Sequence, residues 1–65
     1  MITFLVNGES VKAAPQSIED LVTERIGSAQ GVAVAIDGAV VPRSQWSGEI
    51  TDGAAIDILT AVQGG

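Results

Sequence analysis

Apolar and polar residues alternate at the start of the chain, which is the pattern of a β-strand with one buried face. The apolar residues of this segment occupy every second position: Ile2, Phe4 and Val6. The run ends at Asn7-Gly8, a pair that strongly favours a two-residue hairpin turn. A return strand is therefore expected over residues 9–13. It ends before Pro15, because proline cannot donate a backbone hydrogen bond to a sheet.

The spacing of apolar residues changes after residue 16. They now recur three and four positions apart, as on one face of a helix: Ile18, Leu21, Val22 and Ile26. Ser17 is a good N-cap, and the acids Glu19 and Asp20 suit the positive end of the helix dipole, so capping accounts for both without any functional role. Gly27 is a plausible stop. The pattern predicts one amphipathic helix of about ten residues, which needs a sheet to pack against.

A continuous apolar run, Val-Ala-Val-Ala-Ile, occupies residues 32–36. Such a run indicates a central strand that is covered on at least one face. Asp37-Gly38 closes it with a turn. A short strand over 40–42 should follow at an edge or an end of the sheet, because it finishes in Pro42.

The last strand is expected over residues 55–62, after turns at 43–46 and 51–53. Its residues are mostly apolar on both faces, so the strand should lie inside the sheet. The predicted order is hairpin, helix, strand, short strand, turn and final strand. This order indicates an α+β domain with a mixed sheet of about five strands and one main helix across one face.

Composition excludes most classes of enzyme. The chain has 65 residues, enough for one domain, with no cysteine and no histidine, so thiol nucleophiles, imidazole catalysis and zinc fingers are unavailable. Eight acids against three scattered bases give a net charge of −5, which disfavours nucleic acid and anionic membranes as partners. No metal site is expected.

The sequence also bears on location and nucleotide binding. The N-terminus has no basic segment, and its apolar run is too short for a signal peptide, so we expect a cytoplasmic protein. No glycine-rich loop follows a strand and opens a helix. The chain itself should therefore bind no ATP and no other cofactor.

The most distinctive chemical feature is the tail over 63–65, Gln-Gly-Gly, which directly follows the last strand. Glycine has no side chain, so Gly64 and Gly65 form a thin thread that ends in an unhindered carboxylate and suits a narrow channel. We therefore expect a folded domain over 1–62 and a flexible Gly-Gly tail over 63–65. The working group would be the terminal carboxylate of Gly65.

Nearly the whole chain resembles the ubiquitin-like sulfur carrier proteins, and within them the ThiS family of thiamine (thiazole) biosynthesis. The segments that carry the resemblance are Val41-Pro42-Arg43-x-x-Trp46 and Asp52-Gly53-x-x-Ile56-x-Ile58, running into Gly64-Gly65. The resemblance implies a β-grasp fold. Asp37 stands where many members would carry asparagine, and either residue suits the turn.

The resemblance also implies a carrier, not an enzyme. An E1-like adenylyltransferase of the ThiF family would use ATP to activate the Gly65 carboxylate. A persulfide sulfur would then replace AMP and leave a thiocarboxylate, the sulfur donor for a thiazole synthase of the ThiG family. ATP would belong to the activating partner. The carrier's lack of cysteine suits this role, because an internal thiolate could capture the activated acyl group.

Candidate partner-binding residues lie on the last strand and in the turn before it. If Ile56 faces the helix, Leu59 and Ala61 face the other way, and an exposed leucine on an open sheet face is typical of an interaction surface. Val62 and Gln63 would support the base of the tail. Arg43 is expected to be solvated, to pair with a carboxylate, or to form an ion pair with a partner protein. Burial of Leu59 under a loop is the alternative for that residue.

Two other readings of the sequence stay open. One is the small subunit of molybdopterin synthase, a family that shares the β-grasp and the Gly-Gly end. The short chain and the Val-Pro-Arg-x-x-Trp segment weigh against it. The other is a ubiquitin-like modifier that is conjugated to lysines, or a binding domain with an inert tail. The single tryptophan, Trp46, is expected to cover the end of the core beside Val41 and Ile50.

Overall fold

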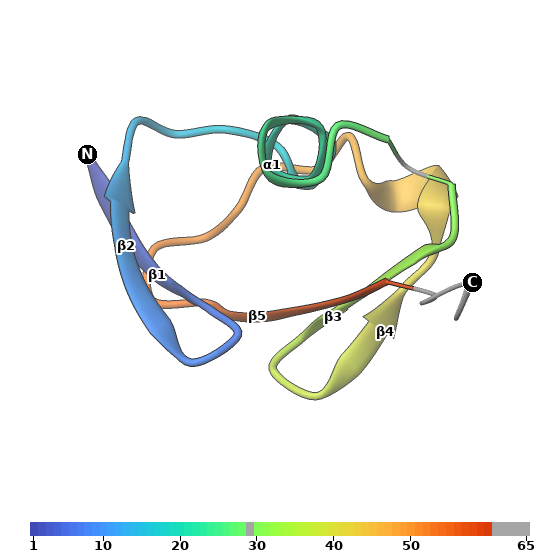
Figure 1. Cartoon of the computed structure of the whole chain (residues 1–65). Helices are drawn as coiled ribbons and strands as arrows, with labels where there is room; N and C mark the ends of the chain where they lie inside the picture. The colour runs from blue at the N-terminus through green and yellow to red at the C-terminus, as the bar shows by residue number, and fades with distance from the viewer. Residues whose placement is uncertain (29, 61–65) are drawn as a thin grey trace.

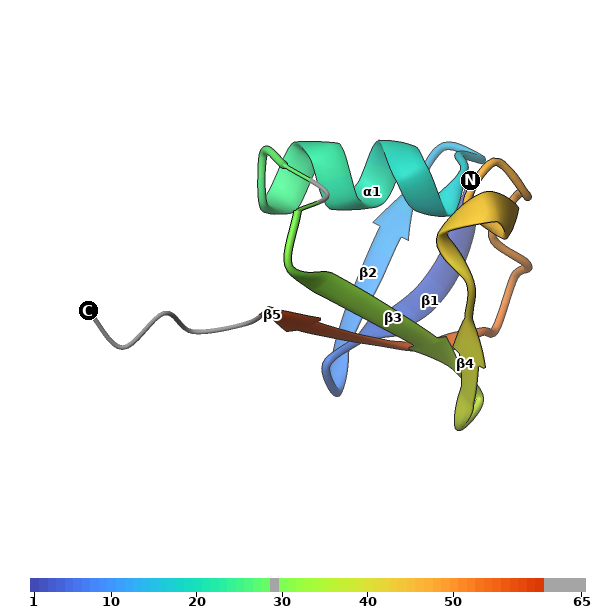
Figure 2. The ribbon, with the colours of Figure 1, turned by 90° about the vertical axis from the view of Figure 1, so that its right-hand side faces the viewer.

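A computed structural model describes residues 1–28 and 30–60 of the chain. They form a five-stranded mixed sheet with the order β2-β1-β5-β3-β4, and one α-helix lies across one face (Figures 1 and 2). The predicted α+β class and the single covering helix are confirmed. The arrangement is a β-grasp, in which the first and last strands pair in parallel at the centre of the sheet.

The N-terminal hairpin forms where the alternating pattern places it. Strand β1 spans Ile2–Val6 and pairs antiparallel with β2, which spans Glu9–Ala13. Asn7 and Gly8 join the two strands with φ angles of 51° and 86°, the left-handed conformation that this kind of hairpin turn requires. The register buries Phe4 and Val6 under the helix and leaves the other parity of β1 on the opposite face.

Helix α1 spans Ile18–Arg25 and is fixed at its start by a capping box. The Ser17 hydroxyl accepts a hydrogen bond from the Asp20 amide, and the Asp20 carboxylate accepts one from the Ser17 amide. Ile18, Leu21 and Val22 are buried against the sheet. The predicted inward position of Ile26 is wrong, because Ile26 is the C-cap residue beyond the last helical turn and its side chain is exposed.

The second hairpin joins β3, Val32–Ile36, to β4, Ala39–Val41. As expected, β4 is an edge strand, but it lies one residue earlier than the predicted 40–42 and stops before Pro42, which has no amide hydrogen to donate. Strand β3 is covered by the helix layer on one face only. The expected tight turn after β4 is a 3₁₀ helix, η1, over Arg43–Gln45. Strand β5, Ala55–Thr60, lies between β1 and β3, which confirms its predicted place inside the sheet.

The core lies between α1 and the covered face of the sheet. Its buried residues come from β1, α1, β3, β5 and the segment between η1 and β5: Phe4, Val6, Ile18, Leu21, Val22, Val34, Trp46, Ile50, Ala54, Ile56 and Ile58. Since a single helix covers a single face, the opposite face of the sheet is left open. In the described part of the chain, β5 therefore has one side covered by α1 and one open side (Figure 2).

Candidate functional site

The tail follows the end of β5 in the sequence. The two strands beside β5 pair with it over different lengths. On one side β3 pairs with β5 as far as Thr60, opposite Val32. On the other side the parallel pairing with β1 ends at Ile56, opposite Val6. The last residues of β5 are thus held by a strand on one side and by the β1–β2 turn on the other.

An asparagine side chain continues the β1 side of the sheet beyond the last strand pair. The Asn7 amide donates to the Ile56 carbonyl over 2.8 Å. The Asn7 carboxamide then binds both backbone groups of Ile58: its Oδ1 accepts from the Ile58 amide at 2.8 Å, and its Nδ2 donates to the Ile58 carbonyl at 3.3 Å. The side chain therefore takes the place of one further peptide group of β1.

Asp37 plays a related part at the start of β5, on the side of β3. Its amide donates to the Ala55 carbonyl at 2.8 Å, and its Oδ1 accepts from the Ala55 amide at 3.0 Å. Asp37 has a φ of 50°, close to that of Asn7, and both residues precede a glycine in a hairpin turn. The aspartate at this position forms the same kind of turn as asparagine would, because here the side chain only has to accept a hydrogen bond.

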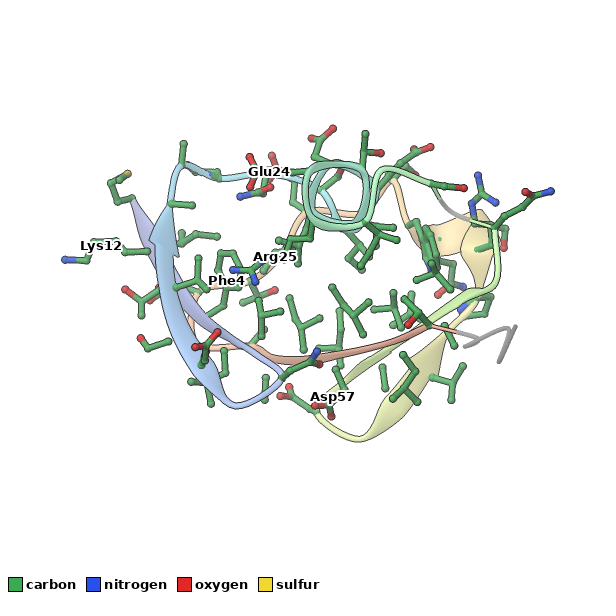
Figure 3. The ribbon with its side chains drawn as sticks, in the orientation of Figure 1. Phe4, Lys12, Glu24, Arg25 and Asp57 are labelled. Atoms are coloured by element: carbon green, nitrogen blue, oxygen red, sulfur yellow. The ribbon has the colours of Figure 1, made fainter. Side chains whose placement is uncertain are left out.

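Leu59 lies on the open face, as its parity predicted. Ile56 and Ile58 are buried under the helix, whereas 67% of the Leu59 side chain is exposed. Asp57 projects from the same open face, away from α1 (Figure 3). The predicted orientation of Leu59 is confirmed and burial under a loop is wrong for it, while its role in docking stays a prediction.

Leu59 is part of a larger apolar group that the strand pairing brings together. We call this group the open-face patch: Leu5, Ala33, Ala35, Val40 and Leu59. Val40 is 77% exposed and Leu5 is 41% exposed, so the patch offers apolar surface across four strands. Of these five residues, the sequence pattern predicts only Leu59 as a partner contact. The outward parity of Leu5 in the first strand was the signal that could have identified it.

Arg43 contacts the ring of Trp46, a contact that is not among the roles expected for it. Its guanidinium is 5.2 Å from the centroid of the Trp46 ring, a cation–π distance, because η1 brings residues three apart to the same side. Trp46 itself is buried, and its Nε1 donates to the Val41 carbonyl at 3.0 Å. The expected role of Trp46 in the core is confirmed. The partner contact of Arg43 stays a prediction.

The remaining predicted site residues, Ala61, Val62, Gln63, Gly64 and Gly65, lie outside the described residues, as does the predicted boundary between domain and tail. Two shallow hollows flank β5. One, of about 250 Å³, is lined by Asn7, Arg25 and Thr60 among others, and Arg25 reaches toward it from α1 (Figure 3). The other, of about 220 Å³, lies beside Asp37 at the far end of the strand.

Within residues 1–28 and 30–60 there is no cluster of acids that could hold a metal ion. The same part of the chain contains no helix long and apolar enough to cross a membrane. The chain contains neither histidine nor cysteine, so its side chains include no imidazole base and no thiol nucleophile.

Comparison with known proteins identifies the family of the chain and agrees with the fold described above. The model of the ThiS family matches residues 2–65 of the chain. A solved structure of the thiamine biosynthesis protein ThiS from Geobacter metallireducens superposes with a TM-score of 0.78 at 25% sequence identity, covering 98% of this chain and 100% of the other. No curated protein matches. The chain belongs to the ThiS family of small ubiquitin-like sulfur carriers, which are carrier proteins and not catalysts.

Proposed function

We propose that this chain carries sulfur for the thiazole ring of thiamine on the carboxylate of Gly65. The observation that carries the proposal is the family match over residues 2–65, which includes both terminal glycines. The solved relative is a thiamine biosynthesis protein, which supports the thiamine branch over the molybdopterin one. The enzymes of thiamine biosynthesis are therefore the partners to test.

Activation of the tail has to come from a partner, because a free carboxylate is a poor electrophile. In the proposed cycle an E1-like adenylyltransferase of the ThiF family binds ATP, and a Gly65 carboxylate oxygen attacks the α-phosphate. Pyrophosphate leaves, and Gly65 becomes an acyl-adenylate. The terminal sulfur of a persulfide then displaces AMP, and a thiol cleaves the resulting sulfur–sulfur bond to leave the thiocarboxylate. ATP is a substrate of the partner throughout.

The second half of the cycle delivers the sulfur. A thiocarboxylate is a better nucleophile than a carboxylate, so it can transfer sulfur to a thiazole synthase of the ThiG family without releasing free sulfide. Two glycines let the chain enter a narrow channel, because no side chain has to pass. The attack joins the Gly65 thiocarboxylate to the substrate as a thioester. Water then cleaves the bond between the Gly65 carbonyl carbon and sulfur, which leaves the sulfur on the substrate and returns the carrier to its carboxylate form.

The open-face patch is the surface we propose for docking. It lies beside the end of β5, so a partner that covers Leu59 also receives the chain that follows Thr60. Charged groups beside apolar surface are typical of a protein interface, and Asp57 lies on β5 opposite Ala35 of the patch. The net charge of −5 favours a basic surface on the partner.

Intact mass measurement tests the proposal directly. The carrier would be incubated with a ThiF-family enzyme, ATP and a persulfide donor, and the expected product differs from the starting chain by replacement of one oxygen with sulfur. That form, mixed with thiazole synthase, deoxyxylulose phosphate and a glycine-derived imine, should yield thiazole phosphate, whereas the unmodified carrier should not. An unchanged mass would reject the carrier role. Sulfur transfer to a molybdopterin precursor, with no thiazole formed, would instead favour the molybdopterin branch.

A further inference from the structure

Asn7 lies at the one place where the end of β5 lacks a strand neighbour. Beyond Ile56, the amide and carbonyl of Ile58 face the side of β1, where strand pairing has already ended. The Asn7 carboxamide meets both groups, at 2.8 Å and 3.3 Å. These two bonds join residues 51 positions apart in the sequence, so they tie the first turn of the chain to the last strand.

The two bonds also demand an amide side chain. Oδ1 must accept from the Ile58 amide while Nδ2 donates to the Ile58 carbonyl, and a carboxylate can only accept. At the matching turn, Asp37 uses its own backbone amide as the donor to Ala55 and its side chain only as the acceptor. Asparagine is therefore required at position 7, whereas either residue serves at position 37.

Ile58 is the last buried residue of β5. Each residue released from the sheet at this end adds about 3.3–3.6 Å to the maximum distance between the sheet and Gly65. Each also has to be ordered again when a partner takes up the tail, and that ordering opposes binding. An anchor at Ile58 thus acts on the step in which the carboxylate reaches the partner's active site.

We propose that Asn7 is a positioning residue for the reaction at Gly65: it holds Ile58 from the β1 side, while β3 holds the other side as far as Thr60, and so orders the end of β5 that the tail follows in the sequence. The inference rests on the proposed function, because it assumes that Gly65 is adenylated. It predicts that Asn7 affects the apparent affinity of the activating enzyme for the carrier. The rate at saturation should not depend on Asn7, since the reacting carboxylate and the partner's catalytic groups are untouched.

Two matched pairs of variants test the proposal. Asn7→Gly and Asp37→Gly each remove a side-chain anchor to β5 at a residue with positive φ, which glycine adopts without strain, but only Asn7 lies at the tail end. Asn7→Asp and Asp37→Asn each exchange a carboxamide and a carboxylate of equal size. The measurements are KM and kcat of the carrier in pyrophosphate release by a ThiF-family enzyme, with amide hydrogen exchange and urea unfolding on the same samples.

We expect Asn7→Gly and Asn7→Asp to raise KM by about three- to tenfold with kcat unchanged, the effect of losing an ordinary hydrogen-bonded anchor. Asp37→Gly and Asp37→Asn should leave KM unchanged. The Ile58 amide should exchange faster in Asn7→Gly only, and the Ala55 amide faster in Asp37→Gly only.

Equal KM values in all four variants would overturn the proposal. So would an increase in both glycine variants, or an increase no larger than the unfolded fraction explains, because each of these would show a general effect on stability. If Asn7→Gly does not fold, Asn7→Asp carries the comparison, since it keeps the size and the acceptor of the native side chain. A wild-type chain that is never adenylated would reject the proposed function itself, a result distinct from adenylation that is insensitive to Asn7.

Discussion

At the scale of single residues, the structure separates side chains that hold the fold from those that are free to meet a partner. Trp46 belongs to the first group, because its ring is buried and its indole amide is bonded to Val41. Leu59 belongs to the second, with 67% of its side chain exposed on a strand whose other face is buried. A single exposed leucine is common on protein surfaces, but Leu59 belongs to the larger open-face patch, and such a patch is typical of an interface.

Changing Leu59→Asp should weaken binding to the ThiF-family enzyme and the thiazole synthase at least about tenfold, because a charge would replace the centre of an apolar contact. The free energy of unfolding should change by less than about 0.5 kcal/mol, since the side chain is exposed. Titration calorimetry and urea unfolding measure the two effects.

Thr23→Asp is the matched control for Leu59→Asp. Thr23 is exposed on α1, and the change adds the same negative charge away from the open-face patch. It should leave binding nearly unchanged. Equal weakening by both variants would point to net charge as the cause, and loss of cooperative unfolding in Leu59→Asp would place Leu59 in the core.

The orientation of Leu59 could be read from the sequence because side chains in a strand alternate regardless of what the strand pairs with. The two bonds of Asn7 could not, because they depend on β1 and β5 lying side by side in parallel, which no local pattern encodes. The stacking of Arg43 on Trp46 depends on the turn after β4 being helical. Once that is known, a spacing of three residues predicts the contact.

At the scale of elements, local signals specified most boundaries, although β4 lies one residue earlier than predicted and α1 is shorter than the expected ten or so residues, with 8. The strands over Ile2–Val6, Glu9–Ala13 and Val32–Ile36 have the predicted bounds, and the helix begins after its predicted cap. The order of strands in the sheet was only partly accessible. Apolar residues on both faces of β5 predicted its place inside the sheet, and Pro42 predicted β4 at an edge. Which strand pairs with β5 on each side depends on tertiary packing, which the local sequence does not encode.

The capping box of α1 gives a prediction at this scale. Ser17→Ala removes the acceptor of the Asp20 amide and should lower the free energy of unfolding by about 1 kcal/mol. For a domain of this size that corresponds to a fall in Tm of roughly 4–8 °C. Since α1 lies on the face opposite Leu59, KM in the adenylation assay should not change.

Ser47→Ala serves as the control for Ser17→Ala. Ser47 is exposed, and its hydroxyl takes no part in the side-chain hydrogen bonds of the described residues. Its Tm should stay within about 2 °C of the wild type, as for most surface substitutions. A Ser17→Ala variant as stable as the wild type would show that packing of Ile18 and Leu21 alone fixes the start of the helix.

At the scale of the whole molecule, the two faces of the sheet differ in what they present. The covered side holds the core, and the open side presents the apolar patch next to the strand that leads to the tail. In the proposed function, the domain brings the Gly65 carboxylate to different partners. Stability and function should then be separable at the C-terminus.

Deleting Gly65, or appending one alanine after it, tests that separation. Deletion moves the terminal carboxylate back by about 3.3–3.6 Å, and an added residue moves it forward and places a methyl group in a channel suited to glycine. We expect pyrophosphate exchange with the ThiF-family enzyme to fall below detection in both variants while Tm stays at the wild-type value, because Ile58 is the last core residue in the part of the chain that the structure describes. Removing Met1, whose side chain is 82% exposed at the other end of the chain, is the control and should change neither quantity. Normal exchange in the Gly65 deletion would show that the enzyme does not read the position of the carboxylate, and a lower Tm in that variant would show that the tail contributes to the fold.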